Sequence, residues 1–235
     1  MLDRIVPRAG TRIITIDPWN HQAKPQVSGT LQFAKPDILH FLDYTRQTAG
    51  IVEGCISLFQ PLGDGRRQIL DILGPGRLIG PYLADLSRCG AIALTRTQLE
   101  VIDPDIDNGR IDAAARLMLL RSRSHALLLG RKTMVERVAT ALLDLAWQFA
   151  RGSPARNRPA FFLHLTRAEM ADWLGLTLES VSRCLNAFKR DGLITFDHPQ
   201  LVTIRDRRAL QTLAAGTFMP ARQRLRSESS SAKSA

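Results

Sequence analysis

Cysteine and histidine are scarce in this chain, and the few present stand apart from one another. The 235 residues include three cysteines, Cys55, Cys89 and Cys184, and five histidines. No cysteines form a CxxC pair, and no two histidines have the HxxxH spacing that places two ligands on one helix face. The sequence therefore predicts no disulfide framework, no metal centre and no bound cofactor.

The chain also lacks long hydrophobic runs. No stretch approaches the roughly 20 consecutive apolar residues of a membrane span, and residues 1–12 lack the apolar segment of a secretory signal. With 45% hydrophobic and 23% charged residues, the composition is that of an ordinary folded protein. We therefore expect a cytoplasmic protein without a membrane partner.

Acidic residues are outnumbered by basic ones, chiefly toward the C-terminus. The net charge is +10, and residues 137–235 hold 15 lysines and arginines against 8 aspartates and glutamates. Concentrated positive charge favours a polyanionic partner, but charge alone does not distinguish DNA from RNA, from an acidic membrane surface or from a merely solvated surface.

Between about residues 31 and 102, short apolar runs alternate with glycine and proline turns. This rhythm predicts an antiparallel β-roll or jelly roll. The region contains no catalytic triad and no pair of carboxylates at helical spacing, so we expect a sensing or scaffolding role and not an enzyme. The predicted strands lie within residues 52–59, 68–73, 91–96 and 98–102.

Residues 111–129 contain neither glycine nor proline and predict one long helix. A helix that is apolar on two sides can cover its own domain with one side and a partner helix with the other. Burial within a single monomer is the alternative. The stripe that we assign to contact with a second copy consists of Ile111, Ala115, Met118, Ser122, His125 and Leu129. The other stripe consists of Ala113, Leu117, Leu120 and Leu127.

Two short helices joined by a glycine turn are expected after residue 165, which is the helix-turn-helix pattern. Thr166 and Glu169 have the spacing of a capping box, which starts a helix that ends near Leu174. Gly175 makes the turn, and Thr177 can cap a second helix over residues 178–190.

The second helix separates its faces clearly. Val181, Leu185 and Phe188 recur at helical spacing and are expected to face the core. On the opposite face, the carboxylate, hydroxyl and guanidinium of Glu179, Ser182 and Arg183 are the groups that base edges in a major groove require. The other predicted DNA contacts, chiefly to phosphate, are Thr166, Arg167, Thr177, Leu178, Ser180, Asn186, Lys189 and Arg190.

A β-hairpin is expected directly after this helix. Gly192 can end the helix in a left-handed conformation, and the apolar runs 193–196 and 201–204 flank the turn residues 197–200. A polar helix face alone is usually just solvated. A capped helix, a glycine turn, a second helix and a hairpin in this order make double-stranded DNA the expected partner of a winged helix-turn-helix.

Residues 165–185 and 189–194 resemble the helix-turn-helix signature of the CRP/FNR superfamily. Residues 52–54, 65–69 and 74–80 resemble its β-roll, and residues 111–129 resemble its dimerization helix. The resemblance implies an α+β fold with an N-terminal cyclic-nucleotide-binding-like β-roll, a long dimerization helix and a C-terminal winged helix-turn-helix. It also implies a homodimer that binds a palindrome and activates transcription by contacting RNA polymerase. The expected segments are 1–108 (β-roll), 109–134 (dimerization helix and hinge), 135–219 (DNA-binding domain) and 220–235 (disordered basic tail).

The base-reading residues place the chain near one branch of that superfamily. Glu179, Ser182 and Arg183 match the Glu-x-x-Ser-Arg set of FNR-type members, whereas catabolite activators have an arginine at the position of Leu178. The resemblance implies half-sites of the TTGA kind. Dimer geometry places these about one helical turn apart, which gives a site like TTGA-N6-TCAA.

Departures from the superfamily pattern narrow the choice of subgroup. Members that bind cyclic nucleotides have a glutamate for the ribose after the glycine that matches Gly80, whereas this chain has Pro81. Those members also have an Arg-Ser pair for the phosphate, where this chain has Cys89-Gly90, with Arg88 one residue away. We therefore do not expect this chain to bind a cyclic nucleotide. An FNR-type iron–sulfur cluster needs three N-terminal cysteines, but the first cysteine is Cys55. What remains resembles the FixK-type subgroup, regulators of low-oxygen gene programmes without a cluster.

Two alternatives stay open. An effector- or haem-gated sensor of the same superfamily could use the β-roll, with His21 or His40 as haem ligands. An enzyme with a cupin-like β-roll would need a metal-binding cluster, which the sequence does not contain.

Cys184 follows a base-reading arginine on the second helix and suggests redox control. Neighbouring positive charge would favour its thiolate, and oxidation to a sulfinic or sulfonic acid would place negative charge against DNA phosphates. The hypothesis is that peroxide abolishes DNA binding through Cys184; the alternative is that Cys184 is a small, partly buried side chain without a regulatory role.

Overall fold

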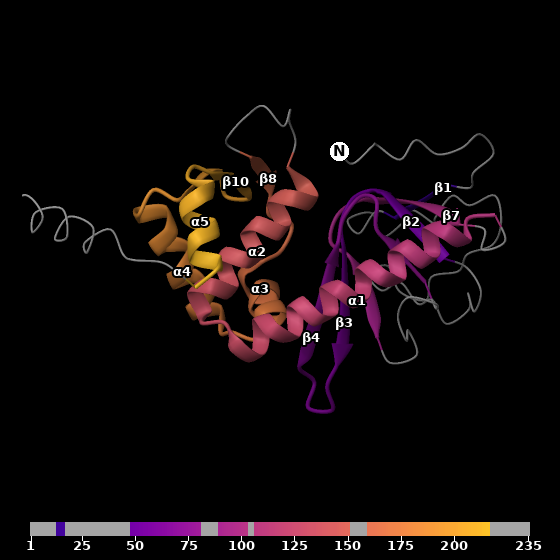
Figure 1. Cartoon of the computed structure of the whole chain (residues 1–235), viewed down its shortest axis with the longest axis horizontal. Helices are drawn as coiled ribbons and strands as arrows, with labels where there is room; N and C mark the ends of the chain where they lie inside the picture. The colour runs from indigo at the N-terminus through magenta and orange to yellow at the C-terminus, as the bar shows by residue number, and fades with distance from the viewer. Residues whose placement is uncertain (1–12, 17–47, 81–88, 103–105, 151–158, 217–235) are drawn as a thin grey trace, which may run out of the picture.

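The computed structural model describes residues 13–16, 48–80, 89–102, 106–150 and 159–216 (Figure 1). Strands gather in the N-terminal part, helices dominate the C-terminal part, and one long helix runs between them. No helix in these ranges is long and apolar enough to cross a membrane. His21, His40, Pro81, Arg88 and the predicted tail 220–235 lie outside the described residues.

The N-terminal part is the predicted antiparallel β-roll, made of two sheets. One sheet has the order β1 (Ile13–Ile16), β7 (Thr97–Ile102), β2 (Thr48–Glu53) and β5 (Leu78–Ile79). The other has the order β4 (Arg67–Leu73), β3 (Ile56–Pro61) and β6 (Gly90–Ala93). Every pair is antiparallel, and alternating side chains such as Ile51, Ile56 and Leu99 fill the space between the sheets.

Gly54 divides the run predicted over residues 52–59 between two strands of different sheets. Its φ of 104° is a conformation that side chains rarely adopt. A Cβ there would also lie 2.4 Å from the hydroxyl oxygen of Thr97. The glycine therefore lets β2 and β3 leave one sheet for the other, which an apolar run alone does not show.

The predicted long helix is α1 (Asn108–Arg131), with 24 residues. It continues through Gly130 and ends before Lys132, whose backbone is extended. Thr133 then caps α2 (Met134–Phe149) in a capping box with Glu136. One extended residue and one cap thus separate the two helices.

Part of the α1 stripe that was predicted to contact a second copy packs against its own chain, so the predicted dimer set requires correction. Ile111 is 8% exposed and packs with Leu78 and Ile102 of its own β-roll. His125 stacks on Trp173 of the same chain, with ring centroids 6.4 Å apart.

The remaining members of that set do not form one exposed face either. Met118 and Leu129 are partly buried against the same chain, whereas Ala115 and Ser122 are exposed. By contrast, Leu117, Leu120 and Leu127 of the second stripe are 39%, 58% and 63% exposed. Both stripes are apolar, so periodicity alone could not show which of them meets the β-roll.

The C-terminal part contains the predicted helix-turn-helix and wing. These are α3 (Arg167–Leu174), α4 (Leu178–Arg190) and the hairpin of β9 (Ile194–His198) and β10 (Leu201–Ile204). Two elements were not predicted: β8 (Ala160–Phe162), which pairs with β10, and α5 (Arg207–Ala214), which packs on α2.

A partly buried ion-pair network joins the two parts of the chain at Arg121 of α1. Its Nε donates to Asp71 Oδ2 of β4 at 2.8 Å, and its Nη1 donates to Asp144 Oδ1 of α2 at 2.6 Å. Asp71 is 8% exposed and also accepts a hydrogen bond from Arg77. One guanidinium thus holds the β-roll, the long helix and the first helix of the C-terminal part together.

Candidate nucleic-acid interface

Local hydrogen bonds fix the helix-turn-helix as predicted. The hydroxyl of Thr166 accepts from the Glu169 N–H at 3.1 Å, and the Glu169 carboxylate accepts from the Thr166 N–H at 2.8 Å. Gly175 ends α3 with a φ of 59°, and Gly192 follows α4 with a φ of 72°. Both glycines are left-handed, which was predicted for Gly192, while Gly175 was predicted only to make the turn.

α4 presents one face to the core and the other to solvent. Val181, Leu185 and Phe188 are buried as predicted. On the opposite face Glu179 and Arg183 are exposed, with side-chain exposures of 75% and 70%. Ser182 lies half-buried beside them. The candidate base-reading residues therefore stand together at the N-terminal half of α4.

Glu179 and Arg183 form an ion pair on the exposed face of α4. An Nη of Arg183 lies 3.3 Å from a carboxylate oxygen of Glu179, one helical turn earlier. An exposed pair of this kind contributes little to stability. It nevertheless places the guanidinium and the carboxylate side by side on the exposed face of α4.

The other predicted DNA contacts fall into two groups. Leu178, Asn186, Lys189 and Arg190 are exposed along α4. The hydroxyls of Thr166, Thr177 and Ser180 are engaged in capping: Thr177 accepts from the Ser180 N–H at 3.1 Å, and the two hydroxyls lie 2.9 Å apart. These hydroxyls primarily set the start of each helix.

Arg167 packs against the wing. Its guanidinium carbon sits 5.1 Å from the ring centroid of Phe196 in the wing, and its Nη1 is buried with no hydrogen-bond partner among the described residues. Burial lowers the pKa of Arg167 below its usual range. In this conformation Arg167 packs α3 against the wing, so a phosphate contact would require the side chain to move.

The structure corrects the chemistry expected of Cys184. Its side chain is 4% exposed and lies on the core face of α4 with Val181 and Leu185. Burial raises the pKa of the thiol, and the nearby Arg183 offsets this only partly. The thiolate is therefore disfavoured and not promoted, and the sulfur does not lie on the exposed face of α4.

Sequence reasoning missed the side chains that hold the helix-turn-helix from outside. Arg67 donates through Nε to Asp172 Oδ2 at 3.0 Å, and Gln68 donates to the Asp172 backbone carbonyl at 2.7 Å. Both donors lie on β4, about a hundred residues before their acceptor. No local spacing could have indicated these contacts.

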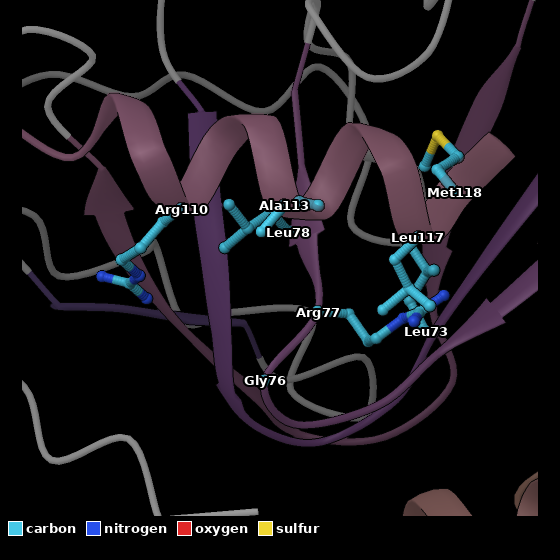
Figure 2. A pocket seen from close by; sticks show the side chains of 9 residues that line it. Leu73, Gly76, Arg77, Leu78, Arg110, Ala113, Leu117 and Met118 are labelled. Atoms are coloured by element: carbon cyan, nitrogen blue, oxygen red, sulfur yellow. The ribbon is translucent and has the colours of Figure 1, made fainter. Parts of the chain in front are cut away.

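A pocket of about 230 Å³ lies between α1 and the turn that joins β4 to β5 (Figure 2). Its lining is mainly apolar, with Arg77 and Arg110 as the charged members. Arg110 is paired with Glu100. Among the described residues, the lining contains no histidine or cysteine that could bind a haem iron, and it does not include Gly80, Cys89 or Gly90. Within the described ranges, no group of three or more histidine, cysteine, aspartate or glutamate side chains is placed to hold a metal ion.

Comparison with known proteins gives consistent matches. Residues 136–213 match the family model of the Crp-like helix-turn-helix domain. The chain is 34% identical over 173 residues to the nitrogen fixation regulation protein FixK of Azorhizobium caulinodans, covering 69% of each chain. It is 33% identical over 171 residues to the transcriptional activator protein FnrL of Cereibacter sphaeroides, covering 67% of this chain and 68% of the relative.

Solved structures share the fold as well. The structure of FixK2 from Bradyrhizobium japonicum matches with a TM-score of 0.63 at 31% identity, covering 72% of this chain and 87% of that chain. A CRP/FNR family regulator from Thermus thermophilus, TTHA1359, matches with a TM-score of 0.59 at 21% identity, covering 74% of this chain and 90% of that chain.

Proposed function

Because the chain belongs to the FixK-type branch of the CRP/FNR family of transcription regulators, we propose that it works as a homodimer on a palindrome of the TTGA-N6-TCAA kind. As a member of that family it is a DNA-binding transcriptional activator and not an enzyme. The finer proposal is that it contacts RNA polymerase and activates genes of the low-oxygen response.

The exposed group on α4 carries this proposal. Glu179 and Arg183 stand clear of the core with Ser182 between them, while the rest of the helix is anchored by buried apolar side chains. A carboxylate can accept from cytosine N4, and a guanidinium can bond guanine O6 and N7 at once. Side chains at the N-terminal end of a recognition helix reach deepest into a major groove.

A symmetric pair of chains would supply two such groups. The unburied leucines of α1, Leu117, Leu120 and Leu127, follow a spacing of three and seven residues, which suits a helix packed along a second copy of itself. These leucines replace the stripe first assigned to the dimer. Two α4 helices held in this way would meet half-sites about one turn of DNA apart.

Replacing Arg183 with alanine is expected to weaken binding to TTGA-N6-TCAA by about 1–3 kcal/mol and to relax selectivity at one base pair, because the bidentate contact to guanine is lost. Fluorescence anisotropy with the palindrome, with its single-base variants and with random duplex measures both effects.

Lys189→Ala is the matched control for that experiment. Lys189 is exposed near the end of the same helix, where a phosphate contact is expected. Its loss should weaken binding to all duplexes alike and reduce the salt dependence by about one phosphate contact. Equal losses on palindrome and random DNA for Arg183→Ala would remove that residue from the base-reading role.

Cys184 is expected to react slowly with peroxide in the folded protein, because its thiol is buried and its pKa is raised. Mass spectrometry after timed peroxide exposure should show oxidation much slower than in the urea-unfolded chain. Gel shifts should show that Cys184→Ala and wild type lose DNA binding at similar rates. Rapid loss confined to the wild type would restore Cys184 as a redox switch.

A further inference from the structure

Arg137, in the first turns of α2, binds backbone carbonyls from two other helix ends. Its Nη2 donates to the Leu129 carbonyl at 2.7 Å, and its Nε donates to the Lys132 carbonyl at 2.9 Å. Its Nη1 donates to the Leu174 carbonyl at 2.9 Å and to the Gly175 carbonyl at 3.3 Å. The first two acceptors close α1, and the last two close α3.

Carbonyls at these positions need a donor from outside their helix. The last four carbonyls of an α-helix have no partner within it, and they carry the negative end of the helix dipole. A guanidinium suits such a place because it is planar, remains charged and offers five donors in a fixed fork. Arg137 therefore connects the end of the long helix to the turn that leads into α4.

The backbone of the turn supports the same contact independently. A Cβ added to Gly175 would lie 3.2 Å from Leu129 Cδ2 and 3.4 Å from Arg137 Nη1. The end of α1 therefore rests directly on the helix-turn-helix turn. Leu129, predicted to meet a partner chain, instead packs against this turn and the core below it.

Lys132 secures the junction from its other side. Its Nζ donates to the Thr140 hydroxyl of α2 at 2.8 Å and to the Ala214 carbonyl at the end of α5 at 3.0 Å. Its own carbonyl is one of the four acceptors of Arg137. Both the backbone and the side chain of the single extended residue are thus fixed. Arg137 adds a polar link from this junction to the turn between α3 and α4, beside the apolar packing of α2 on α4.

We propose that Arg137 is a positioning residue that sets the orientation of α4 relative to α1 and thereby the half-site spacing that the dimer accepts. The inference rests on the proposed function, because spacing has meaning only for two copies on a palindrome. Arg137 touches no base; it acts by holding the turn between α3 and α4 at the end of the helix that joins the two chains.

The consequence is a dependence of affinity on spacer length. While Arg137 bonds both helix ends, the two α4 helices of the dimer are fixed relative to each other, and only one spacer presents both half-sites correctly. Without these hydrogen bonds, the end of α1 and the turn can shift against each other. The dimer then binds correct and incorrect spacers with similar affinity.

The test uses full-length Arg137→Lys on duplexes with spacers of N5, N6 and N7, with fluorescence anisotropy as the measurement. Lysine keeps a cation beside both helix ends, but its single ammonium cannot serve two helices with a fixed fork. We expect wild type to bind the duplex with the preferred spacer about tenfold or more tightly than the other two. A factor of this size corresponds to the contribution of one hydrogen bond from a charged donor. In Arg137→Lys this preference should fall to about twofold or less.

Arg123→Lys is the matched control, since Arg123 is an exposed arginine on α1. It should keep the spacer preference of the wild type. Arg137→Gln, which retains an amide donor at the same place, serves as a second variant, and circular dichroism establishes that each variant is folded.

The outcomes separate the two proposals. A wild type without spacer preference overturns the proposed palindrome and the inference with it. A full preference in folded Arg137→Lys or Arg137→Gln overturns the inference alone, as does an equal loss of affinity on every spacer. Failure of both variants to fold would show that the residue serves stability and not orientation.

Discussion

Arg121→Met is expected to destabilise the protein by about 3–5 kcal/mol, because it leaves two partly buried carboxylates without their shared cation. The side chains of Asp71 and Asp144 are 11% and 23% exposed, and both accept hydrogen bonds from the same guanidinium. Burial lowers the pKa of Arg121, but the hydrogen bonds to Asp71 and Asp144 more than offset this and raise it. Methionine keeps an unbranched apolar stem of similar length to that of arginine and removes the guanidinium with its charge and its donors.

Urea unfolding monitored by circular dichroism measures this effect. Arg123→Met is the control, because an exposed arginine on the same helix should change the free energy of unfolding by less than about 0.5 kcal/mol. Adding Asp71→Asn and Asp144→Asn to Arg121→Met should recover part of the loss, since neutral amides are less costly to bury than unpaired charges. A loss below about 1 kcal/mol would mean that water replaces the guanidinium at little cost.

The double variant Leu120→Glu, Leu127→Glu is expected to be a monomer that binds the palindrome far more weakly than wild type. The two leucines are 58% and 63% exposed on the face of α1 that we assign to the partner. Losing an anchor from the centre of an interface costs about 2 kcal/mol or more. Symmetry doubles each change, so one leucine alone should raise the dimer dissociation constant by about a thousandfold, and the two together should raise it further.

Ala115→Glu, Ser122→Glu is the matched control for the double variant. Both residues are exposed and belong to the stripe that the sequence assigned to the dimer. They lie seven residues apart, as the two leucines do. Sedimentation equilibrium should show a dimer for this control. A monomeric control beside a dimeric leucine variant would reinstate the original stripe.

The elements that could be predicted from the sequence are those governed by local chemistry. The capping box at Thr166, the turn at Gly175 and the stop at Gly192 each depend on residues at most four positions apart. The faces of α4 follow from its regular spacing. The position of Cys184 could also have been predicted, because it lies three residues after Val181 and four before Phe188, on the buried side.

Features that depend on distant partners could not be predicted in this way. Arg121 bonds Asp71, fifty residues earlier in the chain, and Arg167 packs on Phe196 of the wing. Strand β8 pairs with β10, which follows the helix-turn-helix in the chain, and its three residues are too short a run to predict a strand. The side of α1 that meets the β-roll is likewise decided by tertiary packing between two apolar choices.

The shared hydrophobic core places a limit on how this protein can be divided. Cys55, Ile69 and Ile72 of the β-roll belong to the same buried cluster as Leu142 and Trp173 of the C-terminal part. Cutting the chain before α2 would expose a contiguous apolar surface on the DNA-binding half, and such surfaces promote aggregation. A chimera with one half from a relative would therefore also need that relative's residues on the other side of this core.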